Sequence, residues 1–375
     1  EASQCAVERA LPAMLRGTQT AVVGDHQQLQ PLQLFQAELS KTASNDLIAN
    51  VWEESESLLD LARQRFPVFM LQWHYRSRVP NLIAFSNTRF YHDALRCLPS
   101  PHPADELQPF DYHQLSGRWQ DGVNTLEVHE IVDRTLSYLR EPNGYSIGIV
   151  TFNQAQQDLT LELLDEKIRS LHEAGEANLA DFIDRSLHAS LATGTAEELL
   201  LVRNIENVQG NERDIILFSI GYGPDATGKL SVNFGLLNRI YGENRLNVAI
   251  TRARRRVEVF ASFKPWELKV EQTRHEGPKL LKRWLQQVYN AAEGQQVETT
   301  VDVSRLRDMA RKVDRILSTH DLLLRPIPLD KQTPFFGISR QSEPEYYLAG
   351  LIIESPGWYD TPSALARLVF HQQQL

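Results

Sequence analysis

Apolar positions follow two patterns along the middle of the chain. Residues 146–152 (SIGIVTF) and 214–220 (DIILFSI) are short, nearly continuous apolar runs. Such runs are typical of strands that are buried on both faces of a parallel sheet. Beside them, residues 127–139 and 154–174 repeat apolar side chains at helical spacing. Strands that alternate with amphipathic helices predict an α/β fold with a doubly wound parallel sheet.

The same two patterns continue on both sides of this region. Residues 21–25 (AVVGD) predict a short buried strand that ends in a turn, and the next predicted helices are 57–66 and 80–91. After residue 263 the composition shifts, and the pattern predicts two helices and a strand, at 279–292, 303–317 and 346–354. We therefore predict three parts: the end of one α/β unit at 1–69, a second α/β unit at 70–263, and a mixed α+β extension at 264–375.

Composition narrows the class of protein. The chain has 375 residues, of which 42% are hydrophobic, and a net charge of −9. This charge argues against a surface that coats nucleic acid non-specifically, although it leaves room for a local basic groove. No apolar stretch approaches the roughly 20 residues that a membrane span needs. Cys5 and Cys97 fit neither a disulfide framework nor a metal site, so we predict no metal ligands and a cytoplasmic location.

Two blocks in the second unit carry residues that suit phosphate chemistry. In the first, at 206–223, a turn with Gln209, Gly210 and Glu212 leads into an apolar run. The second, at 244–256, predicts a basic helix. Its arginine face would consist of Arg245, Arg252 and Arg256, and its apolar stripe of Leu246, Ile250 and Ala253. A guanidinium stays charged and donates in a fixed fork, which suits a γ-phosphate during transfer.

Taken with four further blocks in the same order, these two resemble the motifs of superfamily 1 helicases. The amino-acid sequences of the blocks look closest to those of the nonsense-mediated-decay-helicase-like branch. Within that branch they resemble large bacterial DNA-helicase-related proteins. The blocks that resemble motifs II to VI are EASQ (1–4), VVGDHQQLQP (22–31), LQWHYRS (71–77), SIGIVTFNQAQ (146–156), QGNE (209–212) and TRAR (251–254). The resemblance implies a RecA-like fold of the P-loop NTPase superfamily, with the end of RecA-like domain 1 at 1–69 and RecA-like domain 2 at 70–263.

The resemblance also implies roles for single residues. Glu1 would be the general base that polarises the attacking water, and Gln28 would sense the γ-phosphate. Arg76 and Arg252 would be paired arginine fingers. The remaining nucleotide-binding residues would be Gly24, Asp25, Gly210 and Glu212, and those at nucleic acid would be Gln156 (near the adenine or the strand), Gln209 and Asn247.

Each of these residues also has a plainer interpretation. Gln28 would then be a turn residue, Arg76 a solvated or salt-bridged side chain, and Arg254, Arg255 and Arg256 an exposed helix end that the helix dipole favours. The order of the six blocks favours the functional interpretation for Gln28, Arg76 and Arg252.

The implied parent protein is an ATP-dependent helicase or translocase that uses ATP with Mg²⁺. It would unwind or remodel single-stranded or duplex nucleic acid, with DNA favoured over RNA. The chain contains no G-x-x-x-x-G-K-[ST] loop, which cradles phosphates in such motors. We therefore expect this loop upstream of Glu1 in the complete protein, and little ATP binding or hydrolysis by this chain alone.

Two alternatives come from other classes of protein. The chain would also suit a non-catalytic nucleic-acid clamp or regulatory subunit that has kept the RecA-like fold. A helicase–nuclease fusion is the other, because residues 346–375 resemble the strand and helix of a very-short-patch-repair-type nuclease. In that resemblance Glu354 would hold one acidic position, while Ile352 stands at another, and one carboxylate is too few for a two-metal site.

Overall fold

The computed structural model describes residues 2–29, 57–97, 107–141, 144–188, 199–239, 241–294, 307–327, 335–344, 346–353 and 366–369. Its centre is a five-stranded sheet in the order β3-β7-β6-β4-β5, in which every neighbouring pair is parallel. The strands are β3 (Phe110–Gln114), β4 (Ile147–Thr151), β5 (Leu200–Asn204), β6 (Arg213–Ser219) and β7 (Ala253–Ala261).

The central strand β6 is buried on both faces, as its apolar run predicted. Ile215 and Leu217 belong to the core on one face, while Ile216 and Phe218 belong to the core on the other. All four side chains are fully buried. The predicted strands at 146–152 and 214–220 are therefore confirmed as β4 and β6.

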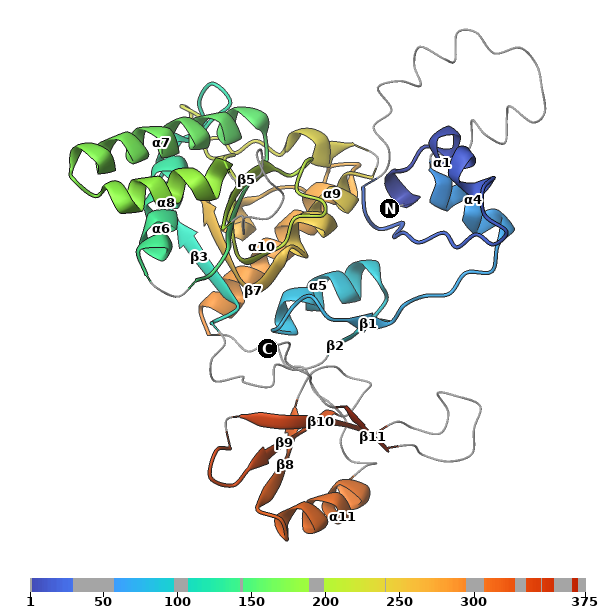
Figure 1. Ribbon diagram of the computed structural model, residues 1–375. Coiled ribbons are helices and arrows are strands. Elements are labelled where there is room, and N and C mark those ends of the chain that lie inside the picture. The colour runs from blue at the N-terminus through green and yellow to red at the C-terminus, as the bar shows by residue number, and fades with distance from the viewer. Residues whose placement is uncertain are drawn as a thin grey trace, which may run out of the picture.

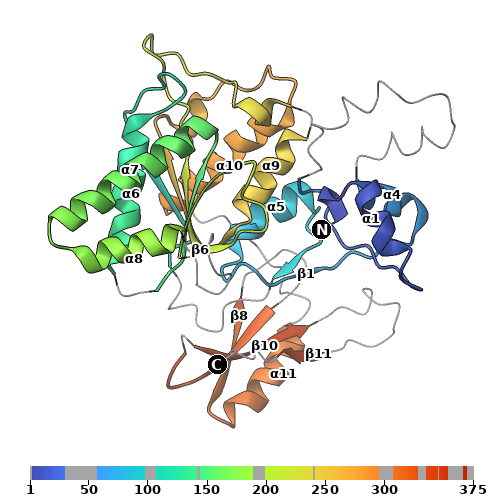
Figure 2. The ribbon, with the colours of Figure 1, turned by 45° about the horizontal axis from the view of Figure 1, so that its top comes forward.

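Helices cover both faces of this sheet (Figure 2). One face carries α6 (Thr125–Arg140), α7 (Gln154–Glu173) and α8 (Ala177–His188). The other carries α5 (Asn81–Phe90), α9 (Gly242–Ile250) and α10 (Glu276–Ala292), together with the short helices η5 (Gly235–Asn238) and η6 (Pro265–Glu267). This is the predicted doubly wound α/β sheet, and it has the architecture of the RecA-like P-loop NTPase fold.

Helix α10 belongs to this body, although it follows residue 263. Trp284 is 2% exposed, and its ring centroid lies 5.0 Å from that of Phe218 on the central strand. Leu281 and Leu285 share the same core and are fully buried. The chain after the last strand of the sheet therefore returns to cover its face.

The N-terminal residues lie beside α5 and α9 (Figure 1). They form η1 (Ala2–Gln4), α1 (Val7–Met14) and α4 (Leu58–Arg65), and the chain continues into β1 (Trp73–His74), which pairs in parallel with β2 (Arg96–Cys97). Helix α4 confirms the prediction at 57–66, and Asp60 N donates to the capping Ser57 Oγ. Between α4 and α5, Phe69, Leu71 and Tyr75 are more than four-fifths exposed.

The predicted strand at 21–25 is wrong for this structure. Residues 21–25 have no regular secondary structure, and Val23 is 71% exposed. A parallel strand needs at least one neighbouring strand to pair with. Among the described residues, this segment lies next to no strand; its Val23 O accepts one bond, from Ala2 N.

The predicted arginine face at 244–256 is also wrong. Helix α9 ends at Ile250, and strand β7 begins at Ala253, so Arg256 lies on a strand rather than on the helix with Arg245. Thr251 Oγ1 donates to the carbonyls of Asn247 and Val248, which satisfies acceptors that the last helical turn leaves free. The predicted apolar stripe is nevertheless buried, with Leu246, Ile250 and Ala253 at most 2% exposed.

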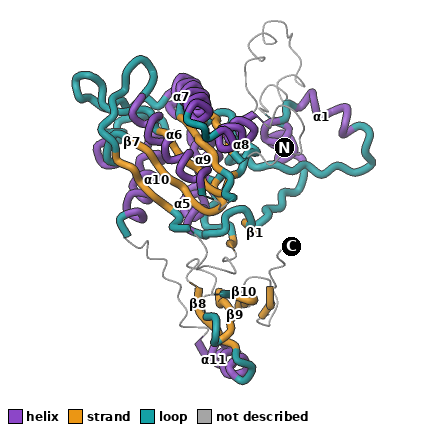
Figure 3. Tube along the Cα trace, turned by 60° about the vertical axis from the view of Figure 1, so that its left-hand side comes forward, coloured by secondary structure: helices purple, strands orange, loops and turns teal. Residues whose placement is uncertain are grey.

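The C-terminal part forms a second, antiparallel sheet in the order β11-β10-β9-β8. The strands are β8 (Leu322–Ile327), β9 (Phe335–Arg340), β10 (Tyr347–Ile353) and β11 (Ala366–Val369), and helix α11 (Arg307–Ser318) precedes them. These elements stand apart from the main sheet in Figure 3. A mixed α+β extension is thus observed. Glu354 lies outside the described residues. Among the residues described, no helix has both the length and the apolar character to cross a bilayer.

Candidate functional site

The turn after residue 24 meets helix α9 of the second unit. Asn244 Nδ2 donates to His26 O and to Gln28 O, each at 3.1 Å, and Asn247 Nδ2 donates to Gln27 O at 2.8 Å. Leu29 N completes the contact by donating to Gln209 Oε1 at 3.2 Å. Segments that are more than 175 residues apart in the sequence are thereby joined at one place.

The side chains of this turn form a second layer of contacts. Gln28 Nε2 donates to Asp25 Oδ2 at 3.0 Å, and the Tyr91 hydroxyl donates to the same oxygen at 2.6 Å. Asn247 Nδ2 in turn donates to the Tyr91 oxygen at 3.1 Å. Burial and the Asp25 carboxylate raise the pKa of Tyr91, so the phenol stays protonated and remains a donor. The predicted residues Asp25 and Gln28 do lie together.

Arg76 and Glu212, both predicted at the nucleotide, form an ion pair. Arg76 Nε donates to Glu212 Oε1, and each side chain is 22% exposed. His74 supports the turn that carries Arg76, because its Nε2 accepts from Ser77 N at 3.1 Å. Burial and the charges of Arg76 and Arg252 lower the pKa of His74 to about 4, so its ring is neutral at pH 7.

Arg252 lies at the end of α9 and is 2% exposed. Its Nε donates to Val248 O at 2.7 Å, and its Nη2 donates to Thr251 Oγ1 at 2.9 Å. Ser77 Oγ donates to Ala253 O at 3.5 Å and Arg78 N donates to Arg254 O at 2.8 Å, so the segment that carries Arg76 lies against the residues that follow Arg252. Asn247, which donates to the Gln28 turn, lies on the helix that precedes Arg252. The two predicted fingers thus lie in one region.

The other predicted positions are distributed as follows. Gly210 has φ +81°, a left-handed conformation that glycine adopts readily, and a Cβ added there would meet none of the described atoms within 4 Å. A Cβ on Gly24 would lie 3.0 Å from Ser3 N, so this glycine permits close packing. Glu1 lies outside the described residues. Asn247 is 1% exposed, and its amide donors contact protein groups rather than facing solvent.

Gln156 lies away from this region, in the interior. It is fully buried; its Nε2 donates to Ser219 Oγ at 2.9 Å, and its Oε1 accepts from Asn124 N at 2.8 Å. These bonds occupy both the oxygen and the nitrogen of the Gln156 side-chain amide, which lies near the carboxyl end of β6. They favour a structural role over contact with adenine or nucleic acid.

Glu127 lies in the same buried cluster. It accepts from Gly221 N at 2.6 Å and from Ser262 Oγ at 2.8 Å, and its side chain is fully buried. Burial raises the pKa of this carboxyl to about 7, although the hydrogen bonds from Gly221, Ser262 and Ser219 partly oppose the shift.

Glu127 should give the protein a measurable pH dependence. Because its folded pKa exceeds the ordinary 4.5, the folded state binds the proton more tightly, and stability falls as pH rises from 4.5 to about 7. The free energy of unfolding should lose about 3 kcal/mol over this range from this group. Urea unfolding of Glu127→Gln should lack that component, while the exposed Glu130→Gln on the same helix keeps it. Identical pH profiles for Glu127→Gln and the wild type would contradict the shift.

A near match to a phosphate loop occurs after β6. Residues 223–229 (GPDATGK) have the spacing of such a loop, but Leu230 stands where Ser or Thr belongs. Asp225 Oδ1 accepts from Thr227 N at 2.8 Å and from Lys229 N at 3.0 Å. A bridge between Pro224 and Leu230 makes the segment a hairpin. Because Asp225 already occupies these amides, residues 223–230 do not form a phosphate cradle.

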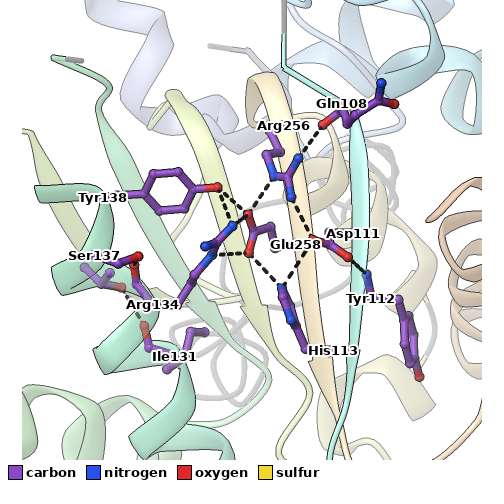
Figure 4. A network of polar contacts seen from close by, with 11 residues as sticks. Gln108, Asp111, Tyr112, His113, Ile131, Arg134, Ser137, Tyr138, Arg256 and Glu258 are labelled. Atoms are coloured by element: carbon purple, nitrogen blue, oxygen red, sulfur yellow. Dashed lines mark hydrogen bonds and ion pairs between the residues drawn. The ribbon is translucent and has the colours of Figure 1, made fainter. Parts of the chain in front are cut away.

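A cluster of potential metal ligands lies on the sheet between β3 and β7 (Figure 4). It consists of Asp111, His113 and Glu258, but two guanidiniums already hold its carboxylates. Arg134 makes two 2.9 Å bonds to Glu258, and Arg256 lies 2.6 Å from Glu258 and 2.7 Å from Asp111. Two fixed cations would repel a metal ion, so the cluster is an ion-pair network that joins β3, β7 and α6.

Comparisons with known proteins agree with this architecture. Residues 54–264, more than half of the chain, match the AAA domain family. The chain is 36% identical over 293 residues to the uncharacterized ATP-dependent helicase MG140 homolog of Mycoplasma pneumoniae. This match covers 76% of this chain and 24% of that protein. The chain is 33% identical over 321 residues to the uncharacterized ATP-dependent helicase MG140 of Mycoplasma genitalium, covering 84% and 27%.

The chain spans about a quarter of the length of these curated relatives. Their names are those of ATP-dependent helicases, in keeping with the order of the six blocks. The family match extends from α4 to β7 and includes Arg76, the loop at 209–212 and Arg252. On these grounds the chain belongs to the AAA domain family, among the superfamily 1 helicase-like proteins.

Proposed function

We propose that this chain supplies the second-domain side of the ATP-driven cleft of a superfamily 1 helicase in the nonsense-mediated-decay-helicase-like branch. The observation that carries the proposal is the meeting of the Asp25–Gln28 turn with α9, close to the Arg76–Glu212 pair. In the full-length protein, ATP with Mg²⁺ would bind against this region. The residues of this chain that would face it are Gln28, Arg76, Gly210, Glu212 and Arg252.

The part played by each side chain follows from its charge and setting. Arg76 is partly exposed, and leaving Glu212 for a phosphate would exchange one anionic partner for another. Gln28 is neutral and already oriented by Asp25, which suits it to sense a phosphate rather than to neutralise it. Mg²⁺, when bound, would screen phosphate charge; the residues here position and neutralise the terminal phosphate.

Residues 1–69 would be the end of a first RecA-like domain, and 70–263 would be the core of the second. The exposed apolar side chains of Phe69, Leu71 and Tyr75 support this division, because large apolar side chains in a row usually face a partner. We further propose that the protein works on nucleic acid in the cytoplasm, on DNA rather than RNA.

Hydrolysis by the full-length protein is the test of this proposal. We expect ATP turnover that rises several-fold when single-stranded DNA is added, with a smaller rise for RNA of the same sequence. The 375-residue chain alone should turn over little ATP, since it lacks a phosphate loop. Tight DNA binding by a full-length protein that never hydrolyses ATP would instead identify a clamp.

A further inference from the structure

We infer that Asn244 and Asn247 are positioning residues that hold the Gln28 turn in its working geometry, an inference that rests on the proposed function. They are three residues apart on α9, so they present neighbouring side chains on one helical face. Both are buried, at 4% and 1% exposure. Their amide donors reach the backbone that carries the Gln28 side chain, so they act on Gln28 through that backbone.

The N–H donors of the two amides are all used, three at the turn and one at Tyr91. A side-chain amide has two N–H donors. Asn244 gives its donors to His26 O and Gln28 O. Asn247 gives its donors to Gln27 O and to the Tyr91 hydroxyl, which in turn holds Asp25. Three successive carbonyls and the support of Asp25 therefore depend on two asparagines.

Asparagine is required here for its donors rather than for its shape. Aspartate has nearly the same shape, but its carboxylate would face carbonyl oxygens with no hydrogen to share. Alanine would remove the donors that hold the three carbonyls of the turn. Arg252 follows the C-cap of the same helix and donates from Nε to Val248 O, so the sensor turn and the proposed finger are both held by α9.

A double-mutant cycle on ATP hydrolysis by the full-length protein tests the role. Asn244→Ala and Asn247→Ala each remove two hydrogen bonds and should each lower kcat about tenfold, with less than a twofold change in KM. Asn244→Asp should be no better than Asn244→Ala. In a Gln28→Ala background, either alanine should cost less than about twofold further, because both act through Gln28. Asn290→Ala, an exposed asparagine on α10, is the matched control.

Hydrogen exchange in the 375-residue chain gives an independent reading. The Asn244→Ala/Asn247→Ala double variant should speed exchange of the Gln28 and Leu29 amides about tenfold or more, while Asn290→Ala leaves them unchanged. Unchanged exchange, or losses of kcat that simply multiply in the Gln28→Ala background, would overturn the positioning role. Faster exchange in a protein whose wild type never hydrolyses ATP would support the contact and refute the proposed function instead.

Discussion

Arg76→Ala in the full-length protein should lower kcat for ATP hydrolysis by about a thousandfold or more, the usual effect of removing an arginine finger. Arg76 pairs with Glu212 and remains partly exposed, so its loss removes a charge from the cleft without opening a buried cavity. Binding of ATP should weaken much less, because the finger acts mainly as the phosphate bond breaks. Single-turnover hydrolysis, with ATP binding measured separately, resolves the two effects.

Arg78→Ala provides the matched control for this substitution. Arg78 lies two residues along the same segment and its side chain is exposed, so its loss should change kcat by less than about threefold.

Arg252 requires a gentler change, because its buried guanidinium also satisfies Val248 O and Thr251. Arg252→Lys keeps the charge and should retain the fold, yet lose most turnover. Normal kcat in Arg76→Ala would remove it from the proposed site.

Glu258→Ala should be the most destabilising single substitution in the described sheet region, by about 3–5 kcal/mol. The carboxylate is fully buried and is held by Arg134, Arg256 and the Tyr138 hydroxyl. Its removal leaves two guanidiniums facing each other without their shared anion. The midpoint of urea unfolding for the 375-residue chain measures the loss. Glu162→Ala, at an exposed position on α7, should stay within about 0.5 kcal/mol of the wild type.

Acid should produce the same loss without a substitution. Burial alone would raise the pKa of Glu258, yet bonds from His113, Arg134 and Tyr138 and the charge of Arg256 hold it well below its usual range. Stability from this group is therefore complete above the ordinary pKa of 4.5 and declines as pH falls below it. If Glu258→Ala and the wild type unfold at the same urea concentration at pH 7, the network contributes nothing to stability.

The centre of the sheet was predictable because burial on both faces leaves a continuous apolar run, as in β4 and β6. Strand β3 was missed for the opposite reason. Its sequence FDYHQ alternates with polar residues that pair with Arg256 and Glu258 rather than with apolar partners. A local pattern does not reveal such pairing. The same limit explains why Arg256 was placed on a helix, since its run of arginines has no strand-like period.

At the candidate site, the residue types were predictable and their partners were not. The order of blocks predicted Asp25, Gln28, Arg76, Glu212 and Arg252, and contacts among their segments bring them into one region. Tyr91 and Asn244 were missed, although Tyr91 ends the predicted helix at 80–91 and Asn244 begins the block at 244–256. Tyr91 contacts Asp25, which is 66 positions away in the sequence, and Asn244 contacts His26, which is 218 positions away. Only the folded chain provides these contacts. Gln156 shows the converse, a polar residue after a strand whose amide is entirely used inside.

The return of α10 onto the sheet determines where this chain can be shortened. A version that ends at residue 263 would still contain every strand of the parallel sheet, but it would lack Trp284, Leu281 and Leu285. The face around Phe218 and Val259 would then be open to water, and the shortened protein would tend to aggregate. Truncation after Ala292 keeps that face covered. The practical end of the parallel-sheet unit thus lies about 30 residues beyond its last strand, a distance that motif boundaries alone would understate.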